Sequence, residues 1–132
     1  MEIFLKLRSK IPIYEQIISQ VQQHIVSGKL TDGAQILSIR ALAKTLQVSV
    51  ITVQKAYEEL QRKGLIESLS GRGTYIKAST TAAIVEEYWD KINHHLSQAL
   101  TLAKDSGIRP QVVVAQLTSL ANIKEEDKHR GK

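Results

Sequence analysis

Apolar residues recur every three or four positions between Ile13 and Ile25, which is the spacing of an amphipathic helix with one buried face. Pro12 precedes this pattern, and proline is well tolerated in a first helical turn. Gly28 follows it in a Ser-Gly-Lys-Leu stretch and is a typical C-terminal cap. The pattern therefore predicts a helix that begins near Pro12 and ends near Gly28.

Two shorter helical patterns follow after a segment, Thr-Asp-Gly-Ala-Gln-Ile, that we interpret as a turn. Ser38 and Ser49 are the expected N-caps of these helices, and Gly64 is expected to end the second one. The inward positions are Ile39, Leu42, Ala43 and Leu46 in the first helix and Val53, Ala56, Tyr57 and Leu60 in the second. Two short helices joined by a tight turn predict a helix-turn-helix unit, whose second helix enters the major groove of DNA.

Alternating runs at 65–69 and 74–78 surround the sequence Ser-Gly-Arg-Gly and predict a β-hairpin. A hairpin after a helix-turn-helix unit is the wing of a winged helix. Arg72 would lie at its tip, where Gly71 and Gly73 can adopt positive φ without strain. We therefore predict a mainly α fold of the α+β kind, with a winged helix-turn-helix domain over residues 1–78.

Residues 79–132 are predicted to form a separate helical region that begins after a polar boundary at 79–83. A helix of roughly 23 residues should end near Gly107 and Pro110, and a shorter helix and a frayed or disordered charged tail should follow. One helical pair is too small to bury the stripe of the long helix. We therefore expect a two-fold dimer. Its contacts would be Val85, Tyr88, Trp89, Ile92, Leu96 and Leu100. Tyr88 and Trp89 could instead line a ligand cage, although aromatic residues at this spacing usually serve packing.

Composition and charge indicate the cellular compartment and the class of binding partner. The chain has no cysteine, no apolar run of a signal peptide and no stretch long enough to span a membrane, so we expect a cytoplasmic protein. Its net charge is +5, and residues 1–78 hold 11 Lys and Arg against 6 Asp and Glu, whereas residues 79–132 hold 7 of each. An excess of positive charge confined to one part suggests an anionic partner, either nucleic acid or a membrane surface.

The stretches PIYEQIISQVQQHIVSGKL (12–30), LSIRALAKTLQVSVITVQKAYEELQRKGLIES (37–68) and GRGTYI (71–76) resemble the DNA-binding domain of GntR-family transcriptional regulators. The C-terminal region is similar to the two-helix dimerisation tail of the small YtrA-like subfamily. The resemblance implies a homodimeric regulator, most simply a repressor, that binds an inverted-repeat operator in double-stranded DNA. It also has departures: Ile36-Leu37-Ser38 stands where the family often has Leu-Pro-Ser, and Val50, Ile51 and Gln54 stand where it often has Asn or Arg.

The positions that the resemblance and the helical geometry assign to DNA contact form one set. It consists of Arg40, Ser49, Val50, Ile51, Thr52, Gln54, Lys55, Tyr57, Gly71, Arg72 and Gly73. Gln54 is the candidate for direct base readout, because its amide can pair with adenine N6 and N7. Ile51 could contact a thymine methyl group or be an ordinary exposed residue. Ser49 and Thr52 could cap the helix, bind phosphate, or do both. Tyr57 is a core position first, with a hydroxyl that could reach a phosphate.

Other classes of function have little support in the sequence. Glu86, Asp90, His94 and His95 could share a helix face as metal ligands, but no second ligating segment accompanies them. No arrangement of nucleophile, base and acid and no phosphate-binding glycine loop occurs, so we expect no enzyme, no catalytic residue and no cofactor. A winged helix that serves as a scaffold for a protein partner and a metal-sensing regulator remain the alternatives.

Overall fold

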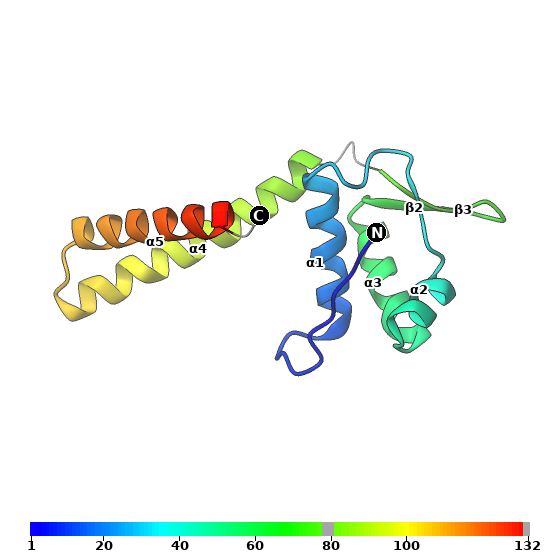
Figure 1. The fold of residues 1–132 in the computed structure, drawn as a ribbon, viewed down its shortest axis with the longest axis horizontal. Coiled ribbons are helices and arrows are strands. Elements are labelled where there is room, and N and C mark those ends of the chain that lie inside the picture. Colours follow the sequence, from blue (N-terminus) through cyan, green and yellow to red (C-terminus); the bar gives the residue numbers. More distant parts are fainter. Residues whose placement is uncertain (78–80, 131–132) are drawn as a thin grey trace. The chain divides into compact units, whose positions relative to one another are not determined.

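The computed structural model describes residues 1–77 and 81–130 and is drawn in Figure 1. The chain divides into two compact units, Met1–Glu86 and Glu87–Lys132. The first unit holds the helices α1 (Ile13–Val26), α2 (Ile39–Leu46) and α3 (Val50–Arg62) and the strands β1 (Gln35–Ile36), β2 (Ile66–Leu69) and β3 (Gly73–Ile76). This order confirms the winged helix-turn-helix fold predicted from the sequence.

The caps of the short helices are those that the sequence predicts. The backbone N–H of Ala41 donates to the Oγ of Ser38 over 3.1 Å at the start of α2. Gly28 and Gly64 have φ angles of 82° and 76° directly after α1 and α3, which is the left-handed conformation that ends a helix. The turn between α2 and α3 uses a non-glycine residue for the same purpose, since Gln47 has φ 57° and ψ 45°.

The sheet has one strand that the sequence analysis missed. The strand order is β1-β3-β2 with antiparallel pairing, so β1 pairs with β3, the second strand of the hairpin, along its free edge. In the register, Gln35 faces Tyr75 and Ile36 faces Thr74. The interpretation of 31–36 as a turn is wrong for Gln35 and Ile36, which form strand β1. A strand of two residues depends on its distant partner for every ladder hydrogen bond and has no periodicity of its own.

The core of the first unit lies where α1, α3 and the sheet meet. Ile17 and Val21 of α1 and Val53 and Leu60 of α3 are all 0% exposed. Leu65 and Ile76, from the two sides of the hairpin, are each 1% exposed, as is Leu42 of α2. The stripes predicted for the three helices therefore point inward, and the opposite face of each helix is left for other contacts.

The C-terminal part consists of α4 (Thr81–Ser106) and α5 (Pro110–Arg130), between which the chain reverses at Gly107 (Figure 1). The long helix ends beside Gly107, as expected, and the following helix begins at Pro110. Two expectations need correction here. The boundary expected at 79–83 lies partly outside the described residues, and from Thr81 onward it is already helical. The charged segment from Lys124 to Arg130 is helical, since it contains no Gly or Pro and continues α5.

Two further properties bear on the class of protein. None of the described helices is long and apolar enough to cross a membrane. In the part of the chain that the structure describes, His, Cys, Asp and Glu form no group of three or more that could hold a metal ion. The metal cluster considered around Asp90 therefore has no support within those residues.

Candidate nucleic-acid interface

Helix α3 has a closed inner face and an open outer face. Val53, Ala56 and Leu60 are all 0% exposed against the core. On the opposite side, Ile51 is 77% exposed, and Gln54 and Lys55 are exposed as well. The helix therefore presents an amide, a cation and an aliphatic side chain outward near its N-terminus, which is the end that enters the major groove in helix-turn-helix proteins. Val50, in the first turn, is 42% exposed on the same end.

The N-terminus of α3 is capped by two hydroxyl groups. Ser49 accepts a hydrogen bond from the backbone N–H of Thr52 at 3.1 Å, and the two side-chain oxygens of Ser49 and Thr52 lie 2.7 Å apart. Capping is thus confirmed for Ser49. A phosphate contact from the same hydroxyl stays a prediction: the cap uses a lone pair of the Ser49 oxygen, and a phosphate would need the hydroxyl proton, which either Ser49 or Thr52 contributes to the bond between their two side chains.

Gln54 is held by its neighbour one turn further along the helix. Its Nε2 donates to Oε1 of Glu58 over 3.1 Å. This bond fixes which end of the amide faces Glu58, so the Oε1 of Gln54 and the second N–H of Nε2 are directed to other partners. An acceptor beside a donor is the pattern that pairs with adenine N6 and N7. The sequence analysis did not assign Glu58 a role, although its i, i+4 spacing from Gln54 was a visible signal.

Tyr57 is a core residue, as its helical position predicts. It is 3% exposed, and its hydroxyl donates to the backbone carbonyl of Leu37 over 2.6 Å. A phosphate oxygen only accepts, so a phosphate contact from Tyr57 would require the bond to Leu37 to break. Burial also raises the pKa of Tyr57, so the neutral, donating form prevails. The residue instead ties α3 to the turn that precedes α2, at the position where the family often has proline.

The wing displays Arg72 on a constrained tip. Gly71 and Gly73 have φ angles of 72° and 102°, as the sequence analysis expected. The backbone N–H of Arg72 donates to Leu69 at 2.9 Å, and its carbonyl accepts from the hydroxyl of Tyr75 at 2.5 Å. Tyr75 therefore ties the backbone of the tip to strand β3, and the Arg72 side chain is exposed.

Gly73 also allows a close approach between strands. A Cβ built on Gly73 would lie 2.5 Å from Nε2 of Gln35, the side chain on the neighbouring strand β1. The φ angle is the reason that the wing needs glycine at this position, since the end of the exposed Gln35 side chain could move away from an added Cβ.

Two further cations belong to the helix-turn-helix unit, one on α2 and one on α3. Arg40, in the first turn of α2, is exposed, as the assignment to DNA contact requires. Lys55 of α3 lies with its Nζ 4.0 Å from the centre of the Tyr14 ring, a cation–π contact between α3 and the first turn of α1. The sequence analysis did not anticipate this contact, which brings the N-terminal end of α1 next to the outward face of α3.

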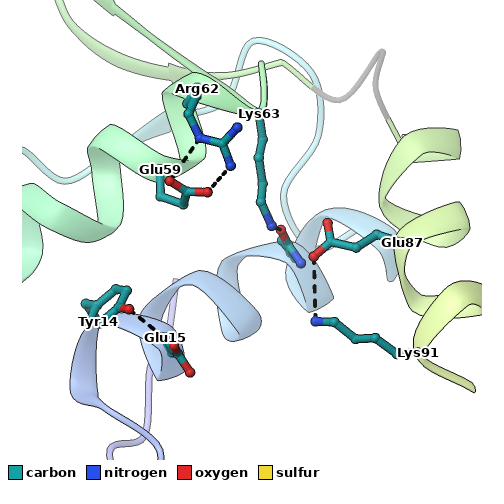
Figure 2. A network of polar contacts seen from close by, with 8 residues as sticks. Tyr14, Glu15, Glu59, Arg62, Lys63, Glu87 and Lys91 are labelled. Carbon is teal, nitrogen blue, oxygen red and sulfur yellow. Dashed lines mark hydrogen bonds and ion pairs between the residues drawn. The ribbon is translucent and has the colours of Figure 1, made fainter. Parts of the chain in front are cut away.

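An ion pair between Arg62 and Glu59 lies at the C-terminal end of α3 (Figure 2). Nε of Arg62 donates to Oε2 of Glu59 over 3.0 Å, and its Nη2 contacts the other carboxylate oxygen. The hydrogen bonds from Arg62 hold the pKa of the Glu59 carboxyl below its usual value. Arg62 is therefore engaged in this pair, in contrast to Arg40 and Arg72.

The apolar stripe of α4 is exposed in the single chain. The exposed fractions are 48% for Val85, 56% for Trp89, 45% for Ile92, 37% for Leu96 and 44% for Leu100. Tyr88 is half-buried. Helix α5 also exposes apolar side chains, among them Leu117 at 50% and Leu120 at 47%. Helices α4 and α5 therefore leave these apolar side chains exposed in the single chain.

The comparison with known proteins places this geometry in a family. The family model described as "Bacterial regulatory proteins, gntR family" matches residues 13–76, the segment from α1 to β3. The HTH-type transcriptional repressor YtrA of Bacillus subtilis (strain 168) is 41% identical over 101 residues, which are 76% of this chain and 78% of that protein. The chain belongs to the GntR family.

Solved structures agree with this GntR assignment. A transcriptional antiterminator from Listeria monocytogenes EGD-e is 29% identical, with a TM-score of 0.71 over 96% of this chain and 92% of that one. The DNA-binding domain of AraR in complex with operator ORX1 is 26% identical, with a TM-score of 0.51 over 58% of this chain and 95% of that one. GntR relatives that bind DNA operators thus share the winged-helix unit, and the similarity to YtrA extends beyond it.

Proposed function

We propose that the protein is a cytoplasmic transcriptional repressor that binds an inverted-repeat operator as a homodimer. The observation that carries the proposal is the outward face of α3, where Ile51 and Gln54 stand exposed on a helix whose other face is closed by the core. The likeness to the repressor YtrA and to an operator-bound winged helix supports the same function.

In this proposal each exposed group has one task on the duplex. Gln54 reads an adenine edge in the major groove, and Ile51 packs against a thymine methyl group. Arg40 contacts a phosphate beside the groove, which sets the register of α3. Arg72 reaches from the wing tip into the minor groove or to its phosphates. Affinity then comes mainly from the cations, and sequence choice comes from α3 and the wing.

The exposed stripes of α4 and α5 support the dimer. Burying one Leu, Ile or Trp side chain contributes about 1.5–3 kcal/mol. Five such side chains of α4 alone are more than one third exposed. A second copy of the same surface would cover them, since a two-fold interface is self-complementary. The two winged helices of such a dimer would read two half-sites of an inverted repeat.

The proposal is tested by selecting genomic DNA fragments with the purified protein and titrating the best fragment at several salt concentrations. Arg40→Ala and Arg72→Ala should each weaken operator binding by about 1–3 kcal/mol, because each removes a charged contact to DNA. Thermal unfolding should be unchanged in both variants, since the two side chains are exposed.

Arg109→Ala is the matched control, because Arg109 is also exposed but lies in the turn between α4 and α5. It should leave operator affinity within error of the unmodified protein. Operator affinity that is the same in all three variants would remove Arg40 and Arg72 from the interface. Binding that is weak, independent of sequence and insensitive to salt would remove the DNA-binding function itself.

A further inference from the structure

The N-terminal segment is fastened to α1 by side-chain amides. The side chain of Gln20 pairs with both backbone groups of Phe4. The backbone N–H of Phe4 donates to Oε1 of Gln20 at 2.8 Å, and Nε2 of Gln20 donates to the Phe4 carbonyl at 2.7 Å. Four residues earlier on α1, Gln16 accepts from the N–H of Lys6 at 2.8 Å and donates to the Lys6 carbonyl at 3.0 Å. One turn further on, Nε2 of His24 lies 2.8 Å from the carbonyl of Glu2. The segment therefore runs along α1 in a fixed register (Figure 1).

Gln16 also closes the loop that joins this segment to α1. It is 8% exposed, and its Nε2 donates a second hydrogen bond, to the carbonyl of Ile11, at 2.8 Å. Inside the loop, the N–H of Ser9 donates to the Lys6 carbonyl at 3.2 Å and the N–H of Ile11 donates to the Oγ of Ser9 at 3.1 Å. The buried amide of Gln16, through its three hydrogen bonds to Lys6 and Ile11, thus holds both ends of the loop 6–11 at the start of α1.

This pinned loop displays three cations. Lys6, Arg8 and Lys10 are all exposed, and we call them the basic loop. The acidic residue nearby is Glu15 in the first turn of α1, which accepts a hydrogen bond from the hydroxyl of Tyr14 at 3.2 Å (Figure 2). One carboxylate does not cancel three cations, so the local balance stays positive. Since three hydrogen bonds join the Gln16 side chain to the backbone of the loop, its charge is displayed at a fixed place instead of on a free tail.

The basic loop leads directly into the end of α1 that contacts the recognition helix. Lys10 lies four residues before Tyr14 in the chain, and the Tyr14 ring lies 4.0 Å from the Nζ of Lys55 on α3. A duplex that seats α3 in its major groove has its phosphates along both edges of that groove. The start of α1, and with it the loop, is therefore near one of those edges.

We infer that the basic loop is an additional phosphate-contacting surface, which extends DNA contact beyond α2, α3 and the wing onto the flank of each half-site. This inference rests on the proposed DNA-binding function. The partner is the sugar-phosphate backbone of duplex DNA and not a base edge, because lysine and arginine on a loop outside the groove meet phosphates first. The loop adds affinity and salt dependence without adding sequence preference.

The test compares two triple variants that remove the same charge. Lys6→Gln, Arg8→Gln and Lys10→Gln together neutralise the basic loop. Lys29→Gln, Lys104→Gln and Lys124→Gln together neutralise three exposed lysines that lie after α1 and on α4 and α5. Both variants are titrated with a mixed-sequence duplex at several salt concentrations, after sedimentation shows that their oligomeric state is unchanged.

The slope of log affinity against log salt should fall by about 2–3 per protomer in the basic-loop variant, because each lost phosphate contact removes about 0.9. The slope of the control variant should stay close to that of the unmodified protein. Equal slopes in the two variants would overturn the inference, since net charge alone would then explain the effect. An unmodified protein with no salt-dependent affinity for any duplex would overturn the inference together with the proposed function.

A second variant separates the loop's position from its charge. Gln16→Leu keeps every cation but removes the bonds that hold the two ends of the loop. Hydroxyl-radical footprinting on a selected fragment should then lose protection at the flank of the half-site and keep it in the centre, as it should for the basic-loop variant. A footprint that is identical in the unmodified protein and in both variants would also overturn the inference.

Discussion

At the scale of single residues, Gln54 and Glu58 act as a unit. The hydrogen bond between them orients the Gln54 amide before DNA arrives, so the entropy of ordering this side chain is spent during folding and not during binding. An oriented amide also discriminates better, because a freely rotating one could present donor and acceptor in either order. Glu58 itself is an acid on the helix proposed to face DNA and would repel phosphates, so we expect its role to be the positioning of Gln54.

Glu58→Ala and Glu58→Gln form a matched pair that tests this role. Both variants lose the negative charge, so both should bind duplex DNA somewhat more tightly overall. Glu58→Gln keeps an acceptor for the Nε2 of Gln54 and should keep the base preference, whereas Glu58→Ala should lose part of the about 1–3 kcal/mol that a bidentate pair with adenine supplies. Sequencing the fragments that each variant enriches from a random pool measures the preference.

The expected outcome for Glu58→Ala is a weakened adenine preference at one position of the half-site, with the other positions unchanged. Gln54→Ala should abolish the preference at that same position. If Glu58→Ala enriched the same sequences as Glu58→Gln, the positioning role would be wrong. A change at several positions at once would instead indicate that α3 had moved as a whole.

At the scale of elements, the N-terminus of α3 combines a structural bond with a place for an anion. Ser49 caps the helix through Thr52. Replacing a serine cap by alanine costs about 1 kcal/mol of stability, whereas aspartate is as good a cap as serine. Ser49→Asp should therefore unfold at the same temperature as the unmodified protein and bind DNA more weakly, because its carboxylate would meet the phosphate that Ser49 is proposed to contact.

Gln61→Glu provides the control for Ser49→Asp, since it adds the same charge near the other end of α3, where Gln61 is exposed. Its DNA affinity should fall much less than that of Ser49→Asp. Equal losses in the two variants would mean that only net charge matters and that Ser49 is a cap alone. Ser49→Ala distinguishes the roles further, because it should lower the unfolding temperature whether or not phosphate binds.

The elements that the sequence predicted are those with local signals. Ser38 and Ser49 are polar residues directly before an apolar stripe, and Gly28 and Gly64 are the residues that tolerate positive φ at a helix end. The strand β1 had no such signal, because Gln35 and Ile36 are in a strand only through pairing with Tyr75 and Thr74. Local chemistry is visible along the chain, but a partner 40 residues away in sequence is not.

The candidate site was predictable to a similar degree. Helical spacing correctly separated the exposed Ile51 and Gln54 from the buried Val53 and Leu60. The same periodicity put Tyr57 in the core, and only the resemblance to a family suggested a phosphate contact for it. The contacts that organise the surface, such as Lys55 on Tyr14 and Gln16 on the loop before α1, join different elements and follow from packing alone. The regular Gln16–Gln20–His24 spacing was a signal that could have been noticed.

At the scale of the whole molecule, each of the two units supplies what the other lacks. The winged helix covers its own core but offers only a small set of base-reading groups, so one copy reads a short sequence. Helices α4 and α5 leave a row of apolar side chains exposed. Joining two copies through α4 and α5, as proposed, would double the number of bases read and cover that row, so we expect operator choice and dimer formation to depend on each other.

Leu96→Glu tests this dependence. A two-fold interface contains every substituted position twice, so the variant would lose two buried leucines, worth about 1.5–3 kcal/mol each, and would bury two carboxylates near each other. Sedimentation velocity should show a monomer at concentrations where the unmodified protein is a dimer. Gln98→Glu, an exposed position on α4 outside the stripe, adds the same charge and should remain dimeric.

DNA binding by Leu96→Glu should then distinguish recognition of one half-site by a single winged helix from recognition of the full inverted repeat by the dimer. Affinity for a full inverted repeat should drop strongly, because the second winged helix no longer arrives with the first. Affinity for a duplex with a single half-site should be unchanged, because the outward face of α3 is the same in both proteins. If Leu96→Glu still sedimented as a dimer, the interface would lie elsewhere than on the stripe of α4. If it were monomeric but kept full affinity for the inverted repeat, dimer formation would not be part of operator recognition.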